Sequence, residues 1–406
     1  MIYIYDEYFS NPEFIEHKSV YGNLKRRTGP YEFVDSVKQP TLFLISLDVY
    51  QDVPQEQVDR IGSLYKKHSG CKILIDTCIE DFLEESFFNL TMSLSKAGVK
   101  HDDVYVLSAQ QFLGPFIDLY KVDYPVFGIN RMEINFYDYV NSLSDNHKGL
   151  HLYRDIKPRK LKKHFISYKK NPRMLRLLFH GFFLEKGYID KSYYSWHALN
   201  PIKPYHINAC KEFGLFSNVS DLDNQSMEDA INLFTERHIT SEDIGQSVHE
   251  WSMEEDVVLH GGINLTHETH QIYDRKFREN DKLIHRLDAI PLHASIFLTE
   301  KTYKNFAYGL PFLNPGVPRS EYVLKTLGYK TWDSFFKTRV DNLSYSHCIK
   351  SYMRMIDEIA AMPLQDLEDL LNSQQSLDYL NHNMEVFREQ RQFKRLIDIL
   401  IALEDK

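Results

Sequence analysis

The stretch SIFLTEKTYKNFAYGLPFLNPG, residues 295–316, says most about how this chain folds. Its apolar side chains between Tyr303 and Ala307 have helical spacing, and Gly309 is a typical residue for ending a helix. Leu310–Leu313 then reads as a short buried strand, and Asn314–Gly316 reads as a turn. This order of loop, helix, strand and turn predicts one repeat of an α/β fold.

The first turn of the predicted helix, Thr299–Thr302, carries the chemistry of this stretch. A helix N-terminus presents free N–H groups and a partial positive charge, and both attract phosphate. Lys301 adds a full positive charge, and the two threonines add hydroxyl donors. Glu300 would repel a phosphate, so we expect it to accept hydrogen bonds from a sugar diol. A ribose beside a phosphate fits this set, whereas the alternative interpretation is a capped helix with solvated charges.

Length and composition indicate a soluble protein with room for two ordinary domains. The 406 residues are 43% hydrophobic and 26% charged, and no apolar run approaches the ~20 residues of a transmembrane helix. The first residues lack the basic and apolar segments of a signal peptide. The cysteines, at Cys71, Cys78, Cys210 and Cys348, have no metal-like spacing and predict reduced thiols in a cytoplasmic protein. The net charge of −9 argues against a surface that is basic throughout.

Most of the first half alternates continuous apolar runs with helical segments. We expect strands at residues 2–5, 41–48, 72–76 and 104–108, weaker strands at 126–129 and 134–136, and a helix at about 84–97. Runs that are apolar throughout, rather than at every second residue, indicate a mainly parallel sheet with both faces covered.

A second set of strands and helices follows a polar and basic linker. We place the boundary near residue 155, which gives domains at 1–155 and 156–380 and a C-terminal helix at 381–406. Further strands are expected at 164–168, 192–196 and 257–259, with a helix at 174–186 and helices from residue 349 onward. No G-x-G-x-x-G motif occurs at the start of the second domain, which argues against dinucleotide redox chemistry. The spacing of His260, His267 and His270 matches no standard zinc pattern, so no metal site is expected.

Three stretches resemble one group of glycosyltransferases. TEKTYKNFAYGLPFLNPG is similar to the donor-binding segment of glycosyltransferases with two facing Rossmann-like domains, the GT-B type, as found in phages and marine viruses. The same segment is more faintly similar to the TEK segment of fucosyltransferases. Ser320–Phe336 and Ile166–Asp190 are similar to further segments of the viral group. The resemblance implies an α/β fold of two facing Rossmann-like domains, with a C-terminal helix that packs back towards the first domain.

In that group the second domain binds the nucleoside-diphosphate sugar. The resemblance implies that Glu300 contacts the ribose, that Lys301 lies near the diphosphate, and that the loop after Ser167 approaches the diphosphate. Trp196 ends a strand where a base can stack, although a core tryptophan is the alternative. A UDP-sugar is the favoured co-substrate, and lysine and arginine replace a metal. The expected donor-binding residues are Ser167, Lys169, Asn171, Arg173, Arg176, Trp196, Thr299, Glu300, Lys301 and Thr302.

Four acidic residues in the first domain are candidates for the catalytic base. Asp48, Asp76, Glu80 and Asp81 lie at or just after the carboxyl ends of two predicted strands. Ligands of parallel sheets bind beyond those ends, and an inverting transferase needs a carboxylate or histidine to accept the proton of the acceptor hydroxyl. We expect Asp76 or Glu80 first, and the alternative is that these acids cap the following helices.

The function at the acceptor side is open between three possibilities. Viral relatives favour a 5-hydroxymethylpyrimidine in phage DNA, which enzymes reach by flipping the base out of the duplex. The basic run of Lys157, Arg159, Lys160, Lys162 and Lys163 is compatible with double-stranded DNA, although a solvated linker is the alternative. The competing functions are a glycan or lipopolysaccharide glycosyltransferase and a catalytically silent nucleotide-sugar-binding protein. A phage-encoded enzyme would act in the host cytoplasm.

Overall fold

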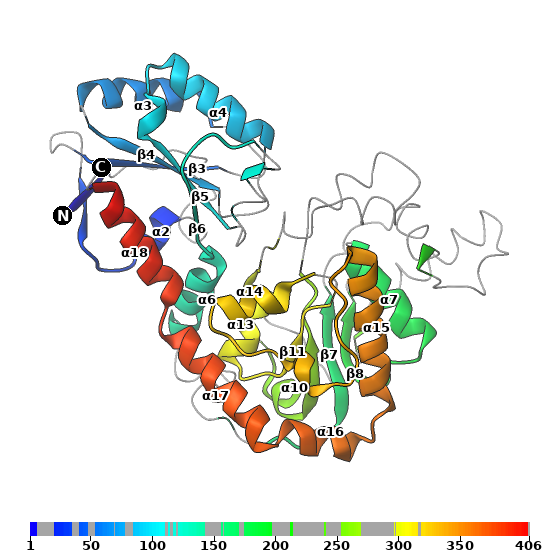
Figure 1. The fold of residues 1–406 in the computed structure, drawn as a ribbon. Helices are drawn as coiled ribbons and strands as arrows, with labels where there is room; N and C mark the ends of the chain where they lie inside the picture. The colour runs from blue at the N-terminus through cyan, green and yellow to red at the C-terminus, as the bar shows by residue number, and fades with distance from the viewer. Residues whose placement is uncertain are drawn as a thin grey trace. The chain divides into compact units, whose positions relative to one another are not determined.

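The computed structural model divides the chain into two compact units, described here one at a time (Figure 1). Unit 1 comprises Met1–Tyr139, His293–Leu298 and Gln390–Lys406, and unit 2 comprises Val140–Leu292 and Thr299–Glu389. The boundary predicted near residue 155 therefore lies inside unit 2. The structure describes residues 1–5, 20–34, 40–47, 53–68, 70–77, 84–109, 113, 117–118, 121–142, 156, 158–169, 174–196, 212–213, 239–240, 253–268, 296, 298–315 and 318–404.

Unit 1 contains a six-stranded parallel sheet in the order β2-β1-β3-β4-β5-β6. The strands are β1 (Ile2–Tyr5), β2 (Tyr31–Val34), β3 (Leu42–Ser46), β4 (Lys72–Thr77), β5 (Val104–Ser108) and β6 (Val126–Gly128). The helices are α2 (Val20–Lys25), α3 (Gln55–Lys67), α4 (Glu84–Lys96) and α6 (Arg131–Ser142), with a 3-10 turn η2 at His101–Asp103. The continuous apolar runs of β3 and β5 are buried along their whole length, as a covered parallel sheet requires.

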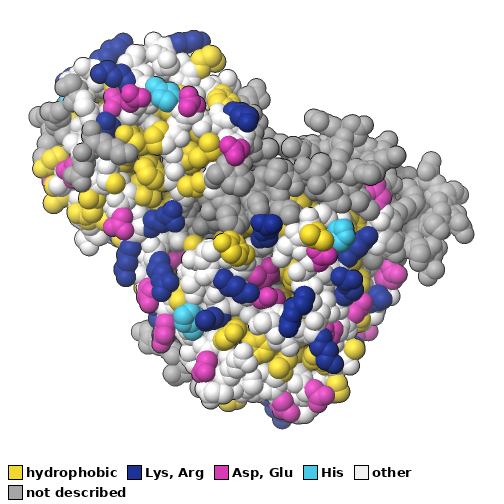
Figure 2. Space-filling model, in the orientation of Figure 1, with side chains coloured by type: hydrophobic (Ala, Val, Ile, Leu, Met, Phe, Trp, Pro, Cys, Tyr) yellow, Lys and Arg dark blue, Asp and Glu magenta, His cyan; other side chains and the backbone are white. Residues whose placement is uncertain are grey.

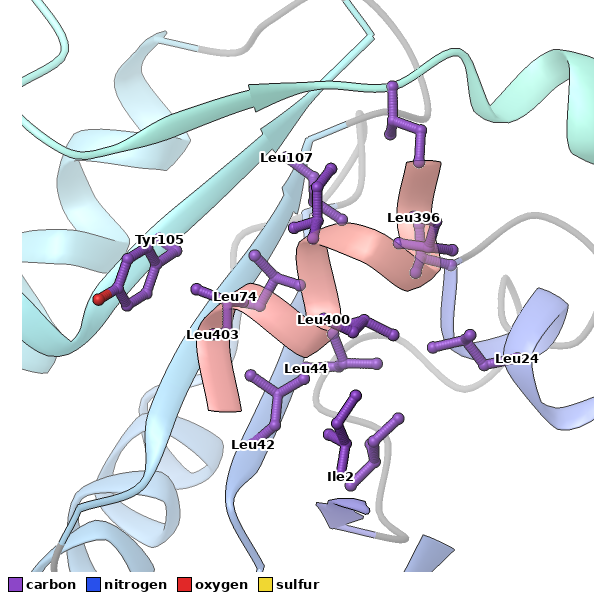
Figure 3. Packing of buried hydrophobic residues seen from close by; sticks show 14 of the residues in the cluster. Ile2, Leu24, Leu42, Leu44, Leu74, Tyr105, Leu107, Leu396, Leu400 and Leu403 are labelled. Atoms are coloured by element: carbon purple, nitrogen blue, oxygen red, sulfur yellow. The ribbon is translucent and has the colours of Figure 1, made fainter. Parts of the chain in front are cut away.

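The last helix of the chain, α18 (Arg391–Glu404), belongs to the core of unit 1. Its Leu396, Leu400 and Leu403 are buried in one cluster with side chains of β1, β3, β4 and β5 (Figure 3). Burial of a leucine side chain contributes about 1.5–3 kcal/mol, so this helix is part of the fold rather than an appendage. The Gln392 side chain also accepts a hydrogen bond from the backbone N–H of Asn130 at 2.9 Å.

Unit 2 contains a five-stranded sheet in the order β11-β10-β7-β8-β9, in which only β9 runs antiparallel to its neighbour. The strands are β7 (Lys163–Lys169), β8 (Ser192–Trp196), β9 (Ile239–Thr240), β10 (Gly261–Leu265) and β11 (Phe312–Leu313). The helices are α7 (Met174–Glu185), α10 (Glu255–His260), α13 (Glu300–Ala307), α14 (Ser320–Thr326), α15 (Tyr345–Ala361), α16 (Leu364–Leu371) and α17 (Gln374–Arg388), with a 3-10 turn η5 at Trp332–Phe335. The two sheets and the helical C-terminal segment confirm an α/β fold.

Three predictions of local structure were wrong. The strand predicted at 134–136 lies inside α6, which Asn130 caps by accepting the Glu133 N–H at 3.3 Å. The strand predicted at 257–259 is α10, and the strand β10 follows it immediately. A Cβ at Gly262 would lie 2.2 Å from the carbonyl oxygen of His164, so glycine allows β10 to approach β7. The single helix predicted at 381–406 is two helices, because Gln390 between α17 and α18 has φ of 52°.

Within the described residues, no helix has both the length and the apolar character needed to cross a membrane.

Candidate functional site

The first turn of α13 lies at the carboxyl edge of the unit 2 sheet. The segment Thr266–Glu268 follows β10 directly, and Glu268 is hydrogen-bonded to Thr299, the residue that caps α13. Ligands of parallel sheets bind at this edge. The structure therefore brings the predicted Thr299–Thr302 segment to the place where an α/β sheet presents its binding residues.

The N–H groups of this first turn are largely used by the protein itself. The Thr299 N–H donates to Glu268 Oε1 at 2.9 Å, and the Lys301 N–H donates to Thr299 Oγ1 at 3.3 Å. The Thr302 N–H donates to the Thr299 carbonyl at 3.1 Å. A phosphate at this helix start would need N–H groups that have no protein partner, and the first turn of α13 offers few of them. Binding at this turn must depend on side chains.

The two threonine hydroxyls are also engaged within the protein. Thr299 Oγ1 donates to Glu268 Oε2, and Thr302 Oγ1 donates to Glu268 Oε1 at 2.5 Å. Both threonines are buried, and Glu268 is 1% exposed. The pKa of Glu268 is raised overall, because burial outweighs the lowering by Lys301 and by the hydrogen bonds of Thr299 and Thr302, and Glu300 adds to the rise. The hydroxyls that were expected to contact a ligand instead hold a buried carboxylate.

Glu300 and Lys301 form an ion pair at the surface end of this turn. Lys301 Nζ lies 2.5 Å from Glu300 Oε1, and the two side chains are 32% and 14% exposed, respectively. Burial alone would raise the pKa of Glu300, but the charge and hydrogen bond of Lys301, together with Lys304, lower it to about 2. Glu300 is therefore a carboxylate at every physiological pH, with lone pairs available to hydroxyl donors.

A second set of hydrogen bonds fastens the body of α13 to β10. Asn264 Nδ2 donates to Asn305 Oδ1 at 2.6 Å, and Asn305 Nδ2 donates to Thr266 Oγ1 at 2.9 Å. All three side chains are buried. Asn305 Nδ2 also donates to the carbonyls of Lys301 and Thr302 at 3.2 and 3.0 Å, so this set holds the body of the helix and also reaches the carbonyl side of its first turn.

Among the described residues predicted to lie near the diphosphate, Lys301 and Arg176 both have contacts, and Arg176 reaches the segment that follows β10. It lies in α7, is buried, and its Nε donates to the His267 carbonyl at 3.3 Å. The His267 ring packs on Phe179 of the same helix, with ring centroids 5.1 Å apart. Arg176 thus packs against the segment that carries Glu268.

We call Arg176, Glu268, Thr299, Glu300, Lys301 and Thr302 the α13 cluster.

The other predicted donor-binding residues are only partly described. Ser167 is in β7, fully buried, and its hydroxyl has no partner in ordinary hydrogen-bond geometry. The backbones of Lys169 and Trp196 are the last residues of β7 and β8, but their side chains are outside the described set. Asn171 and Arg173 also lie outside the described residues.

Among the predicted catalytic acids, only Asp76 is described. It lies in β4, is fully buried, and its Oδ2 accepts the Val20 N–H at 3.0 Å and the Ser46 hydroxyl at 3.2 Å. These bonds hold the start of α2 against the sheet, so Asp76 has a structural contact, although α2 precedes β4 in the chain and is not the following helix of the predicted alternative. Asp48, Glu80 and Asp81 lie outside the described residues.

The basic run does not form one exposed surface. Arg159 is buried and donates to the carbonyls of Val258, Gly261 and Gly309, and burial lowers its pKa to about 10. The prediction that Arg159 binds nucleic acid is wrong, because its guanidinium is used inside unit 2. Lys162 Nζ pairs with Asp256 at 3.1 Å.

The position of the run differs from the prediction as well. Lys163 is the first residue of β7 and donates to the Asp190 carbonyl at 2.8 Å, and Lys160 is exposed just before it. The run therefore lies at the amino edge of the sheet, opposite the α13 cluster. Lys157 is outside the described residues, and basic and acidic side chains are interspersed on the face of the molecule drawn in Figure 2.

Metal binding has no support in the described part of the chain, where no three His, Cys, Asp or Glu side chains come together. Cys71 and Cys348 are buried thiols, and burial raises the pKa of both. Neither is a reactive thiolate.

Sequence reasoning missed Glu268, Asn264 and Asn305. No local motif identifies them, because each acts through a contact with a residue at least 31 positions away. The pattern that could indicate Glu268 is a polar residue shortly after a buried strand, and in the sequence it predicts candidates only in the first domain.

No protein-family model, curated protein or solved structure matches the chain.

Proposed function

We propose that this protein is a glycosyltransferase of the GT-B type that transfers a sugar from a nucleoside-diphosphate donor to a hydroxyl acceptor. The observation that supports it best is the exposure pattern of the α13 cluster. Of its six residues only Glu300 and Lys301 keep exposed surface, and the other four are buried beneath them. The chain thus presents one carboxylate and one ammonium together at the carboxyl edge of a parallel sheet.

The chemistry of this pair suits a nucleotide. The Glu300 carboxylate can accept hydrogen bonds from ribose hydroxyls, and Lys301 can turn from Glu300 towards the diphosphate. In the reaction, the acceptor oxygen forms a bond to the anomeric carbon while the bond from that carbon to the diphosphate oxygen breaks. The diphosphate leaves with the electron pair, and the acceptor proton passes to a base. Lys301 and Arg176 would stabilise the negative charge that develops on the leaving group.

A ligand panel tests the donor half of this proposal. Thermal shift with UDP, GDP and CMP, each with and without Mg²⁺, should give one large upward shift in melting temperature. UDP is the expected ligand, and the shift should not require Mg²⁺. The corresponding nucleotide sugars are then tested for transfer to hydroxymethylated DNA and to glycans. If none of the nucleotides shifts the transition, the proposal fails.

The favoured acceptor is a 5-hydroxymethylpyrimidine in phage DNA, and glycan or lipopolysaccharide acceptors are the competing choice. Because Arg159 is buried, the basic run gives less support to a DNA acceptor than its sequence suggests. Its exposed lysines lie at the amino edge of the sheet. Salt dependence separates the acceptors, because DNA binding weakens steeply with ionic strength and glycan binding does not.

A second candidate is a nucleotide-sugar-binding protein without transferase activity. It is favoured by Asp76, whose carboxylate holds the start of α2 through Val20. Substitution Asp76→Asn separates the two candidates when transfer and melting temperature are measured together. An enzyme that uses Asp76 as its base loses transfer by more than 100-fold, a typical general-base contribution. A structural Asp76 lowers the melting temperature instead.

A further inference from the structure

Glu268 occupies an unusual position at the start of α13. In a capping box, the third residue of the helix is Glu or Gln, and its side chain accepts the N–H of the capping residue. That third residue is Thr302 here, and the N–H of Thr299 is accepted instead by Glu268, which lies 31 residues earlier in the chain. The missing half of the capping box is thus supplied by the segment after β10.

We infer that Glu268 is a positioning residue for the donor site, which fixes the direction in which Glu300 and Lys301 point. This inference rests on the proposed function. Glu268 bonds to Thr299 and Thr302, which flank the Glu300–Lys301 pair in the sequence. Because both flanking residues are fixed, the backbone between them has one arrangement. Glu268 itself is buried and acts through the pair rather than on the ligand.

The role requires an ionised carboxylate. All three groups that face Glu268 act as donors: the Thr299 N–H, the Thr299 hydroxyl and the Thr302 hydroxyl. The Thr299 hydroxyl oxygen already accepts from the N–H and the Nζ of Lys301, so it has no remaining lone pair for a new donor. A glutamine at this position keeps the shape but points an amide N–H₂ at one of these donors. Glu268→Gln therefore breaks the arrangement with little change in volume.

The charges of the cluster add a second effect. Lys301 lowers the pKa of Glu268 and also that of Glu300, so one ammonium serves two carboxylates. Glu268 thereby attracts Lys301 towards the base of the turn, and Thr299 Oγ1 receives a hydrogen bond from Lys301 Nζ at 3.2 Å. Without the Glu268 charge, Lys301 keeps its ion pair with Glu300 and its hydrogen bond to Thr299 Oγ1 but loses the attraction of a second carboxylate.

The matched control is Asn305→Ala. Asn305 also fastens α13 to β10, through Asn264 and Thr266, but its side chain bonds to neither Glu268 nor the Thr299 side chain. Both variants loosen the attachment of the same helix. Asn305→Ala removes bonds to Asn264, Thr266 and the carbonyls of Lys301 and Thr302, whereas Glu268→Gln disturbs the bonds to the Thr299 N–H and to the Thr299 and Thr302 hydroxyls. A loss that merely follows overall stability would appear in both.

The experiment measures two quantities on the full-length wild type, Glu268→Gln and Asn305→Ala. The first is UDP affinity by calorimetry, where Glu268→Gln should bind about tenfold more weakly and Asn305→Ala within about twofold of the wild type. The second is amide hydrogen exchange in the ligand-free protein, where Glu268→Gln should speed exchange at residues 299–303 more than in the rest of α13.

The outcomes separate this inference from the proposed function. If the wild type binds none of UDP, GDP and CMP, the proposed function fails, and faster exchange confined to residues 299–303 still establishes that Glu268 holds the turn. Unchanged exchange there in Glu268→Gln overturns the inference, whatever the nucleotide result. Equal losses of affinity in Glu268→Gln and Asn305→Ala overturn it too, because they show that only helix stability matters.

Discussion

Both α13 and α14 of unit 2 have a glutamate in the first turn, and these two carboxyl groups have opposite properties. In α13, Glu300 is paired with Lys301 behind the capping residue Thr299, and its pKa is lowered to about 2. In α14, Glu321 follows Arg319, which provides no side-chain cap, and burial raises the Glu321 pKa to about 8. Within the described part of the chain, neither Glu321 oxygen has a partner in ordinary hydrogen-bond geometry, and a weaker interaction with the Ser320 hydroxyl lowers its pKa less than burial raises it.

The comparison shows that helix position alone does not determine the state of an acid. A carboxylate near a helix N-terminus is stabilised by the helix dipole, but by only about 0.3–1 kcal/mol at the surface. For Glu300 the ammonium of Lys301 adds to that effect, and for Glu321 the loss of hydration outweighs it. Three substitution experiments test whether Glu300 and Glu321 differ in this way.

The largest expected effect is the pH dependence that Glu321 imposes on stability. Its pKa is raised in the folded protein from 4.5 to about 8, so the folded state binds more protons than the unfolded state in that window. Its contribution should therefore lower the free energy of unfolding as pH rises from 4.5 to about 8, by about 5 kcal/mol in total. Glu321→Gln should remove this fall, as measured by urea denaturation at about pH 5 and about pH 9.

The control for this prediction is Glu385→Gln on the exposed side of α17, which should keep the wild-type pH dependence. If Glu321→Gln and the wild type lose stability in parallel as pH rises, Glu321 is ionised in the folded protein and the contrast with Glu300 collapses.

Glu300 should show the opposite sign with a smaller magnitude. Its folded pKa is lowered from 4.5 to about 2, so its contribution to stability is complete above pH 4.5 and is lost as pH falls through about 2. Because the ion pair is partly exposed, we expect about 2 kcal/mol after allowance for solvent screening. Glu300→Gln should show a shallower loss of stability in an acid titration followed by circular dichroism. An acid transition identical to that of the wild type would contradict the ion pair.

The smallest effects come from the hydroxyls at the two helix starts. Thr299→Ala removes a cap and a bond to Glu268 and should destabilise the protein by about 1–2 kcal/mol. Ser320→Ala removes a buried hydroxyl that interacts with the Glu321 carboxyl only outside ordinary hydrogen-bond geometry, so stability should change by less than about 0.5 kcal/mol. Thermal denaturation of both variants measures the difference. Equal destabilisation would show that the Ser320 hydroxyl forms a full hydrogen bond.

Strands were the most predictable part of the fold. The strands β3, β4, β5 and β8 contain three or four apolar or aromatic residues each, and their positions agree with the prediction to within about two residues. Failures arose where a local pattern was ambiguous. Val257–Leu259 is an apolar run with two β-branched residues, like a strand, yet it lies in α10, and the strand β10 begins only at Gly261.

The candidate site was predictable only where it is local. Thr299 and Lys301 could be identified from the signature of a helix start, because cap and charge lie within four residues. Their partner Glu268 could not, because a long intervening segment separates it from the helix in the sequence. The burial of Arg159 could not be predicted for the same reason, since only the fold places its guanidinium among the carbonyls of Val258, Gly261 and Gly309.

We propose that Glu300 and Lys301 form the contact surface for a nucleotide donor. Calorimetric titration of UDP into the wild type and Glu300→Gln tests it most directly, with Lys330→Met as a control at an exposed lysine of the same unit. We predict that UDP binds the wild type and the control equally, and that Glu300→Gln binds at least about tenfold more weakly, as expected for a lost charged hydrogen bond. Equal UDP affinity in Glu300→Gln, or no binding to the wild type, would contradict the account.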